Sequence, residues 1–240
     1  MYDPYKFKVG GFSENDGTID FYLRVNHLVN ETSTVLDFGA GRAAWFEDDH
    51  CRIRKQIQTL QGKVDRVIAA DIDPIVLHNR ASDKQIFVKD NKINLPDHSV
   101  DVIVADYVLE HLDDIEHFYA EVARLLKPGG WLCARTPHKF CYVSLIAMVV
   151  KNRYHTDILR WAQPTRKSQD VFPTHFNLNT SSKVKTTFKG WQNKSFIFRS
   201  DPDYFFGLKA LYYMQFWLHR ILPKVLVGNL FVFVRKPENG

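Results

Sequence analysis

The 240-residue sequence is poor in cysteine and has no long apolar run, no internal repeat and only a small excess of positive charge. Its three cysteines are an odd number without metal-ligand spacing, which argues against a disulfide framework and favours a reducing compartment. The longest apolar run, residues 140–150, is too short to span a bilayer, and the N-terminus has no secretory-type apolar region. A net charge of +5 biases the chain toward anionic partners without indicating nucleic acid by itself. We therefore expect a cytoplasmic protein.

Short apolar runs alternate with helical patterns through the first 136 residues. The runs are nearly continuous in apolar character, as is typical of parallel strands covered on both faces. They comprise residues 33–38, 65–71, 85–89, 100–106 and 130–136, and the helical patterns between them comprise residues 43–60, 74–80 and 113–127. Repeated strand–helix units predict an α/β fold with a parallel sheet and right-handed crossovers.

The second half of the chain is different, because residues 137–190 are rich in basic and aromatic side chains and have no strand periodicity. A stretch of this length inside a domain indicates a helical or irregular insertion, often a lid. Two further strands are predicted at residues 193–198 and 226–235. Between them, residues 204–222 predict a helix with an apolar face, which comprises Phe206, Leu211, Met214, Trp217 and Leu218.

The most informative segment is VLDFGAGRAAW, residues 35–45, at the first expected strand–helix junction. Gly39 and Gly41 allow the backbone to turn tightly and to approach a ligand where a side chain would block it. Asp37 precedes these glycines and is placed to accept a hydrogen bond from a cationic amine. The segment therefore predicts one wall of a ligand site.

Two further acids follow the next two strands. Asp71 ends the second strand, where an acid in nucleotide-binding sheets takes both hydroxyls of a ribose. Asp90 follows the third strand with Asn91 beside it, a pair suited to an adenine edge. Since the carboxyl ends of successive parallel strands meet at one edge, we expect Asp37, Asp71 and Asp90 to converge on one crevice. The alternative is that these acids only cap helices and turns.

The motif GAGRAA also satisfies the relaxed dinucleotide pattern GxGxxA, so a Rossmann dehydrogenase is an alternative. Two features count against it. Asp37 would repel a pyrophosphate, whereas it suits the ammonium group of a methionine moiety. In addition, the chain after Thr136 offers no second βαβαβ half to carry a nicotinamide.

The order and spacing of LDFGAG, AADIDP, INLPDHSVDVIVADYVLEHL and ARLLKPGGWL resemble the motifs of class I S-adenosylmethionine-dependent methyltransferases, in the generic type 11 branch. The resemblance covers residues 33–136. It implies a Rossmann-like, doubly wound, mostly parallel sheet of seven strands whose last strand is antiparallel. Residues 1–240 would then form a single domain, with a cofactor-binding core at 33–136, an insertion after the fifth strand at 137–190, and C-terminal strands and an amphipathic helix at 191–240.

The resemblance also implies S-adenosyl-L-methionine as the cofactor. Asp37, Gly39 and Gly41 would hold its methionine end, Asp71 its ribose, and Asp90 and Asn91 its adenine. Three neighbouring residues are also expected at the cofactor, and these are Ala40, Ile72 and Asp106. The chain departs from many family members by having Ala43 where they have a third glycine, which narrows the turn slightly.

A sulfonium methyl group is already electrophilic, so the protein mainly has to align a nucleophile, and no metal is required. A hydroxyl acceptor would benefit from a general base. His138, which follows the fifth strand, is the best candidate, and Asp106 is a second unless it only caps a helix. His111 is a third, unless it only braces its loop. His175 qualifies only if the insertion folds over the site.

The acceptor is less constrained. Basic residues crowd the insertion and indicate either a solvated face or a pocket for an anionic acceptor, and these are Lys151, Arg153, His155, Arg160, Arg166, Lys167, Lys183 and Lys185. The helix at 204–222 either packs on the sheet or lies in a membrane interface, which would place the protein at the inner membrane surface. We therefore expect a small-molecule, glycan or lipid-linked acceptor. RNA is less favoured because no RNA-binding motif is present, and a catalytically silent cofactor-binding scaffold is the non-enzymatic alternative.

Overall fold

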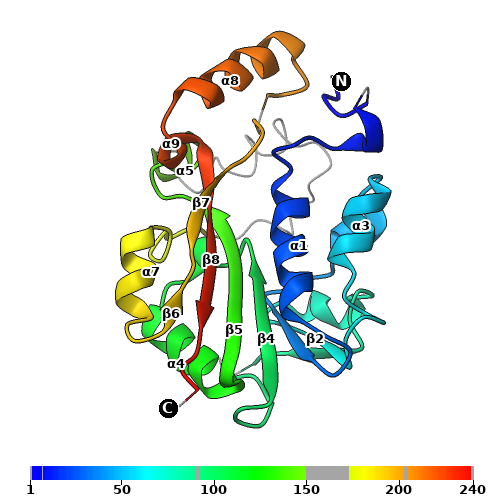
Figure 1. Ribbon diagram of the computed structural model, residues 1–240, viewed down its shortest axis with the longest axis vertical. Helices are drawn as coiled ribbons and strands as arrows, with labels where there is room; N and C mark the ends of the chain where they lie inside the picture. Colours follow the sequence, from blue (N-terminus) through cyan, green and yellow to red (C-terminus); the bar gives the residue numbers. More distant parts are fainter. Residues whose placement is uncertain (1, 7, 90–91, 150–172, 203–204, 239–240) are drawn as a thin grey trace.

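The computed structural model describes residues 2–6, 8–89, 92–149, 173–202 and 205–238. Its centre is one sheet with helices on both faces (Figure 1). The strands are β1 (Thr34–Phe38), β2 (Arg66–Asp71), β3 (Lys84–Phe87), β4 (Val100–Asp106), β5 (Leu126–Pro137), β6 (Gln192–Asn193), β7 (Phe196–Arg199) and β8 (Gly228–Arg235). Their order is β3-β2-β1-β4-β5-β8-β6, with β7 also paired to β8. The first five strands are parallel and β8 is antiparallel to β5, which confirms the predicted Rossmann-like sheet.

The edge beyond β8 differs from the prediction of one strand at residues 193–198. Both β6 and β7 pair antiparallel with β8, and a two-residue interruption separates them. Asn193 Oδ1 accepts a hydrogen bond from the Ser195 backbone N–H at 2.9 Å, and Ser195 Oγ accepts one from the Phe233 N–H at 3.1 Å. These local side-chain bonds replace the regular ladder. The sixth strand of the prediction is therefore divided into two short strands.

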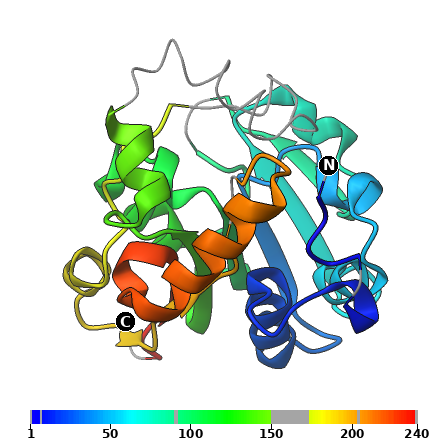
Figure 2. The ribbon, with the colours of Figure 1, turned by 90° about the horizontal axis from the view of Figure 1, so that it is seen from above.

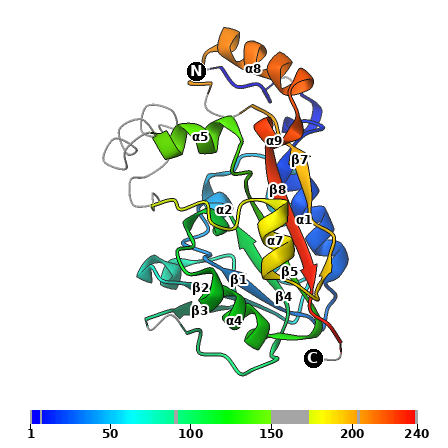
Figure 3. The same ribbon diagram turned by 90° about the vertical axis from the view of Figure 1, so that its left-hand side faces the viewer.

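Helices cover the two faces of the sheet in separate groups (Figure 3). The larger ones beside the sheet are α1 (Gly17–Leu28), α3 (Arg52–Gln58), α4 (Ile115–Leu125) and α7 (Ser181–Thr187). Alternate strand residues face opposite layers, as strands buried on both sides require. Val35 belongs to the core that contains Phe21 of α1, whereas Leu36 belongs to the core that contains Phe118 of α4 and Phe188 beside α7.

Helix α1 was not predicted from the sequence. Its N-cap is Asp16, whose carboxylate accepts from the backbone N–H groups of Thr18 and Ile19 at 3.0 Å and 3.1 Å. The other carboxylate oxygen of Asp16 lies 2.7 Å from Nη1 of Arg54 on α3. The helix buries Phe21 against the sheet. It therefore forms a fixed part of the layer over β1, β4 and β5.

The sequence predicted one continuous helix at residues 43–60, and this prediction is wrong. The structure has two shorter helices there, α2 (Ala44–Asp48) and α3, with extended backbone at Asp49. The Asp49 carboxylate accepts from the Cys51 backbone N–H at 2.7 Å and pairs with Arg54 at 2.7 Å. This turn competes with the helix for the backbone. The predicted helix at 74–80 is instead the 3-10 helix η2 (Pro74–His78), which Asp73 caps.

Three further helices gather beyond the carboxyl ends of the parallel strands (Figures 1 and 3), namely α5 (Tyr142–Val149), α8 (Lys209–Ile221) and α9 (Lys224–Val227). The interpretation that the apolar face of α8 packs on the sheet is wrong, because Met214, Trp217 and Leu218 are exposed. The helix is instead anchored through Tyr212 and His219, which are buried. Within the described residues, no helix has the length and apolar character needed to cross a membrane.

Candidate functional site

Three carboxylates lie at the carboxyl edge of three neighbouring strands. Asp37 is on β1, Asp71 ends β2 and Asp106 ends β4, and all three strands run parallel. Burial, together with the nearby charges of Asp106 and Asp71, raises the pKa of Asp37 to about 8. Because β1 lies between β2 and β4 and all three strands run parallel, the three carboxylates stand at the same edge of the sheet. Such a site favours a cationic ligand group beside Asp37.

The glycine turn after β1 approaches this site with left-handed backbone. Gly39 has φ +71°, and a Cβ atom at this position would lie 2.5 Å from Cγ2 of Val108. Gly41 has φ +49°, and a Cβ atom there would meet nothing within 4 Å. The first glycine is therefore required by protein packing, whereas the second leaves open space. Ala43, where a third glycine was expected from the resemblance, also has a left-handed φ of 52°.

Asp71 is held in place by the loops on either side of it. Its Oδ2 accepts a hydrogen bond from the Gly41 N–H and its Oδ1 accepts one from the Asp73 N–H, both at 2.8 Å. Burial raises the pKa of this carboxyl. The next residue, Ile72, is 64% exposed although it is apolar. A fixed carboxylate beside an exposed apolar side chain is the arrangement that a ribose and its base require.

Asn79 fixes the glycine turn from behind, and the sequence analysis did not identify it. Its amide Nδ2 donates to the carbonyl oxygens of Gly41 at 3.1 Å and Ala40 at 3.4 Å. The side chain is buried. The predicted cofactor residue Ala40 thus belongs to this turn through its backbone. Asn79 holds the backbone of the turn in place.

Asp106 is part of a buried ion pair with Arg135, which is its register partner on β5. The guanidinium donates from Nε to Oδ1 at 2.5 Å and from Nη2 to Oδ2 at 2.9 Å. Two side chains of α1 join this pair, since Thr18 Oγ1 accepts from Arg135 Nη1 at 2.9 Å and the Tyr22 hydroxyl donates to Asp106 Oδ2 at 3.2 Å. The geometry assigns Asp106 a charge partner, and a role as base would require this pair to open. Arg135 was also missed, although a charged residue inside the apolar strand GWLCART was a visible signal.

His111 ends the 3-10 helix η3 (Leu109–His111), which is bonded to residues within the predicted insertion. Its Nδ1 donates to the Pro173 carbonyl at 2.7 Å, and the Glu110 carbonyl accepts from the backbone N–H groups of His175 and Phe176 at 2.7 Å and 3.2 Å. The imidazole of His175 lies 3.8 Å from Asp113. This geometry agrees with the alternative in which His111 braces its loop.

His138 follows β5 and is only 4% exposed. Its Nδ1 lies 3.1 Å from the Val225 carbonyl oxygen of α9, to which it donates when it carries the proton, and 3.3 Å from the Phe140 backbone N–H, from which it accepts in the other tautomer. Burial lowers the pKa of the imidazole below its usual range, which favours the neutral form. In the neutral tautomer that donates from Nδ1 to Val225, Nε2 is the proton acceptor.

Several predicted residues lie outside the described residues. These are Asp90 and Asn91, together with the basic residues of the insertion at Lys151, Arg153, His155, Arg160, Arg166 and Lys167. Across the described part of the chain, no group of three or more His, Cys, Asp or Glu side chains is arranged to hold a metal ion.

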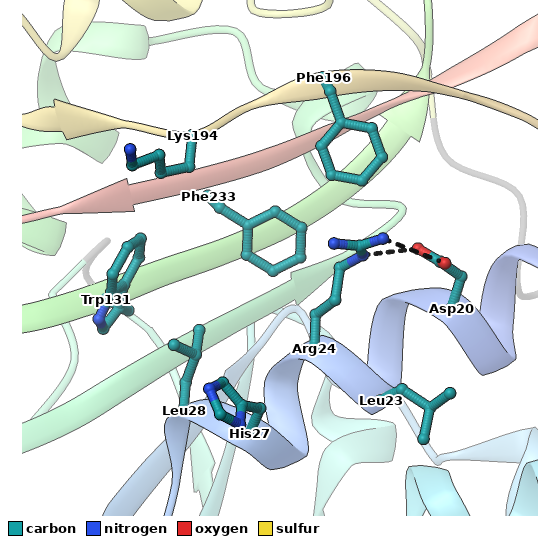
Figure 4. Close-up of a pocket in the computed structure, with 9 residues that line it drawn as sticks. All are labelled: Asp20, Leu23, Arg24, His27, Leu28, Trp131, Lys194, Phe196 and Phe233. Atoms are coloured by element: carbon teal, nitrogen blue, oxygen red, sulfur yellow. Dashed lines mark hydrogen bonds and ion pairs between the residues drawn. The ribbon is translucent and has the colours of Figure 1, made fainter.

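A cavity of about 420 Å³ lies apart from these carboxylates, between α1 and strands β5, β7 and β8 (Figure 4). Its lining includes Trp131, four residues before Arg135 on β5, and Phe196. The Arg24 guanidinium lies 4.7 Å from the centre of the Phe196 ring and pairs with Asp20 at 2.7 Å. The cavity shares no residue with the carboxylate site.

Comparison with known proteins agrees with this geometry. Residues 50–134 match the family model described as a methyltransferase domain. A protein of Mycolicibacterium smegmatis named as a probable S-adenosylmethionine-dependent methyltransferase is 36% identical over 104 residues. That match covers 42% of this chain and 40% of the relative, so it spans less than half of the relative's length.

Solved structures resemble the chain over most of its length. A SAM-dependent methyltransferase from Archaeoglobus fulgidus aligns with a TM-score of 0.55 at 16% identity, covering 91% of this chain and 92% of that chain. The [4+2]-cyclase SpnF aligns with a TM-score of 0.55 at 11% identity, covering 91% and 81%. At these identities the likeness concerns the fold alone, and a fold does not determine a reaction.

Proposed function

The central part of this chain is a class I S-adenosylmethionine-dependent methyltransferase domain, and on this premise we propose that the chain is an S-adenosylmethionine-dependent methyltransferase. Its acceptor would be a hydroxyl or similar nucleophile of a small-molecule, glycan or lipid-linked compound. The observation that carries the proposal is the convergence of Asp37, Asp71 and the glycine turn at one edge of the sheet.

The residues present fit this cofactor. The pKa of Asp37 is raised by burial and by two neighbouring acids, so the site is short of positive charge until a cationic group enters it. The ammonium group of a methionine moiety supplies such a charge. The open space in front of Gly41 lets the backbone approach the ligand without a Cβ atom in the way. A pyrophosphate would add negative charge to the same carboxylates, which disfavours a nicotinamide dinucleotide.

When bound, S-adenosylmethionine supplies a methyl group on a positively charged sulfur. The chain's own contribution is to bind and orient. Asp37 would hold the ammonium group, Asp71 the ribose hydroxyls, and Ile72 would cover the apolar face of the base. The Arg135–Asp106 pair holds α1 over this edge through Thr18 and Tyr22, which helps to exclude water from the reacting groups.

His138 remains the predicted general base for a hydroxyl acceptor, because burial favours its neutral imidazole and the tautomer that donates from Nδ1 to Val225 leaves Nε2 able to accept a proton. The substitution His138→Gln keeps a side-chain donor for the Val225 carbonyl. We expect it to lower kcat by about 10²-fold or more while leaving cofactor affinity unchanged. Full activity of this variant would remove His138 from the mechanism.

Calorimetric titration tests the cofactor. We expect the protein to bind S-adenosylmethionine and not NADH. We also expect Asp71→Ala to weaken binding by about 10- to 100-fold, since hydrogen bonds to a charged group contribute about 1.5–3 kcal/mol. The matched control is Asp65→Ala, because Asp65 is exposed and stands at the opposite end of the same strand. Preference for NADH, binding of neither ligand, or equal loss in the control would overturn the proposal.

A further inference from the structure

The end of the molecule beyond the carboxyl edge of the sheet carries two helices with exposed apolar side chains. Helices α5 and α8 both lie there (Figure 2). The Tyr142 ring of α5 contacts the His219 ring of α8 at a centroid distance of 5.7 Å. We define the α5–α8 surface by six exposed residues, which are Leu145, Ile146, Met214, Trp217, Leu218 and Ile221. No described part of the chain covers them.

The apolar side chains of α8 form a stripe on the side that faces away from the protein. Met214, Trp217, Leu218 and Ile221 recur at spacings of three and four residues, which places them on one face of a helix. The face opposite to this stripe contains Tyr212, which is buried and anchors the helix. Ile221 is 76% exposed and Trp217 is 60% exposed. An apolar stripe on the outer side of an anchored helix indicates a surface that another structure covers.

The sequence segments that form the α5–α8 surface carry no acidic side chain, and the acids Asp201 and Glu14 act on α8 at Tyr212, on its buried face. No aspartate or glutamate occurs between residues 204 and 237, or between residues 122 and 156. Lys209 begins α8, Arg220 lies near its end and Lys224 begins α9, and all three are exposed. The Arg220 guanidinium lies over the Trp217 ring at 5.3 Å, so that a cation sits at the border of the apolar stripe. Aromatic and basic residues at the border of an apolar helix face are typical of helices that lie in a membrane interface.

We propose that the α5–α8 surface docks on an anionic phospholipid bilayer. The apolar stripe would enter the boundary between headgroups and acyl chains, while Arg220 at its border contacts lipid phosphates and carboxylates. A second copy of the chain fits less well, because a twofold contact would bring the cations of one surface against the same cations of the other. Charge complementarity therefore favours the lipid surface.

The position of this surface gives docking a consequence for the reaction. Helix α5 follows the carboxyl end of β5, and α9 leads into β8 where Asn229 pairs with Pro137. The surface thus lies at the same end of the sheet as Asp37, Asp71 and Asp106. Docking would then present a lipid-borne acceptor to the methyl-transfer site, and this consequence rests on the proposed function.

Sedimentation with vesicles of phosphatidylcholine alone, or with phosphatidylserine added, tests the docking without cofactor or acceptor. We expect the protein to bind the anionic vesicles about tenfold or more tightly than the neutral ones, and added salt to weaken this binding. Met214→Glu and Ile221→Glu should each reduce binding about tenfold. The matched control is Leu23→Glu, because Leu23 on α1 and Met214 are both 54% exposed, and it should bind vesicles like the unchanged protein.

Other outcomes would overturn the docking proposal. These are no sedimentation with anionic vesicles, equal binding of the Met214→Glu and Leu23→Glu variants, or a dimer in analytical ultracentrifugation that Ile221→Glu dissociates. Calorimetry with S-adenosylmethionine on the same proteins separates the two proposals. Retained cofactor affinity without vesicle binding contradicts docking alone, whereas vesicle binding without cofactor affinity contradicts the proposed function alone.

Discussion

Arg135 and Asp106 are register partners at the ends of β5 and β4, and the guanidinium of Arg135 donates to both carboxylate oxygens of Asp106. The Arg135 side chain is enclosed by the rings of Tyr107 and Phe21, at 4.8 Å and 5.6 Å from its central carbon. One of the acids at the carboxyl edge therefore has a protein cation beside it. Among the described residues, the charges that act on Asp37 are those of the acids Asp106 and Asp71, and together with burial they raise its pKa.

Removing one member of this pair should destabilise the protein strongly. In Arg135→Met the Asp106 carboxylate stays buried without its charge partner, which costs about 3–5 kcal/mol. For a chain of this size we expect the Tm to fall by roughly 6–20 °C in thermal unfolding followed by circular dichroism. The double variant Arg135→Met with Asp106→Leu should recover most of this loss. A double variant as unstable as the single one would contradict the pair's role.

The two glycines of the turn should respond differently to alanine. Gly41→Ala should lower the free energy of unfolding by about 1–2 kcal/mol, because alanine disfavours left-handed backbone. Its new Cβ atom meets no protein atom, so the main effect should be a loss of S-adenosylmethionine affinity of about tenfold or more. Gly39→Ala carries the same backbone cost and also places its Cβ 2.5 Å from Val108 Cγ2, so it should lower stability further. Thermal unfolding and calorimetry on both variants measure this difference.

A second substitution checks the cause of the Gly39 effect. Val108→Ala removes the methyl group that the new Cβ would meet, and added to Gly39→Ala it should restore part of the lost stability. The same substitution added to Gly41→Ala should restore none. Equal responses in the two backgrounds would show that contact with Val108 does not distinguish the glycines.

The parts of the site that were predicted from the sequence depend on short-range patterns. Asp37, Gly39 and Asp71 stand at strand ends, and the apolar runs that define those strands are local. The break at Asp49 was missed because a single carboxylate turning onto the Cys51 N–H outweighs an otherwise helical pattern. Such competition between side chain and helix depends on the detailed geometry of one turn.

The parts that were missed depend on contacts between residues far apart in the chain. Asn79 reaches Gly41 across 38 residues, and Arg135 reaches Thr18 across 117 residues. Nothing in the local pattern around either residue indicates its partner. For α8, the periodicity indicates two faces but not which of them the rest of the chain covers. The sequence therefore left two interpretations of this helix open, and the exposure of Met214 and Trp217 contradicts the one in which its apolar face packs on the sheet.

Cofactor binding should release a proton from Asp37. Its pKa of about 8 in the free protein leaves the carboxyl protonated at pH 7, and a cationic ammonium group beside it favours the ionised form. Affinity for S-adenosylmethionine should therefore rise between pH 6 and pH 8, by up to about tenfold per pH unit. Calorimetry at pH 7 in buffers of different ionisation enthalpy measures the released proton. Asp37→Asn should bind weakly and without this buffer dependence, and a buffer-independent enthalpy in the unchanged protein would contradict the assignment.

The same carboxyl should make the stability of the free protein depend on pH. An unfolded chain ionises Asp37 near its ordinary pKa of 3.8, whereas the folded protein keeps the proton until about pH 8. Between these values the folded state binds more protons than the unfolded state, so the free energy of unfolding contributed by Asp37 falls as the pH rises from about 4 to about 8. Asp37→Asn should remove this slope and leave the variant more stable than the unchanged protein at pH 8, while Asp65→Asn should not. Urea unfolding at pH 5 and pH 8 compares the three proteins. A variant that loses stability at both pH values would mean that Asp37 stabilises the fold in its ionised form, contrary to the raised pKa.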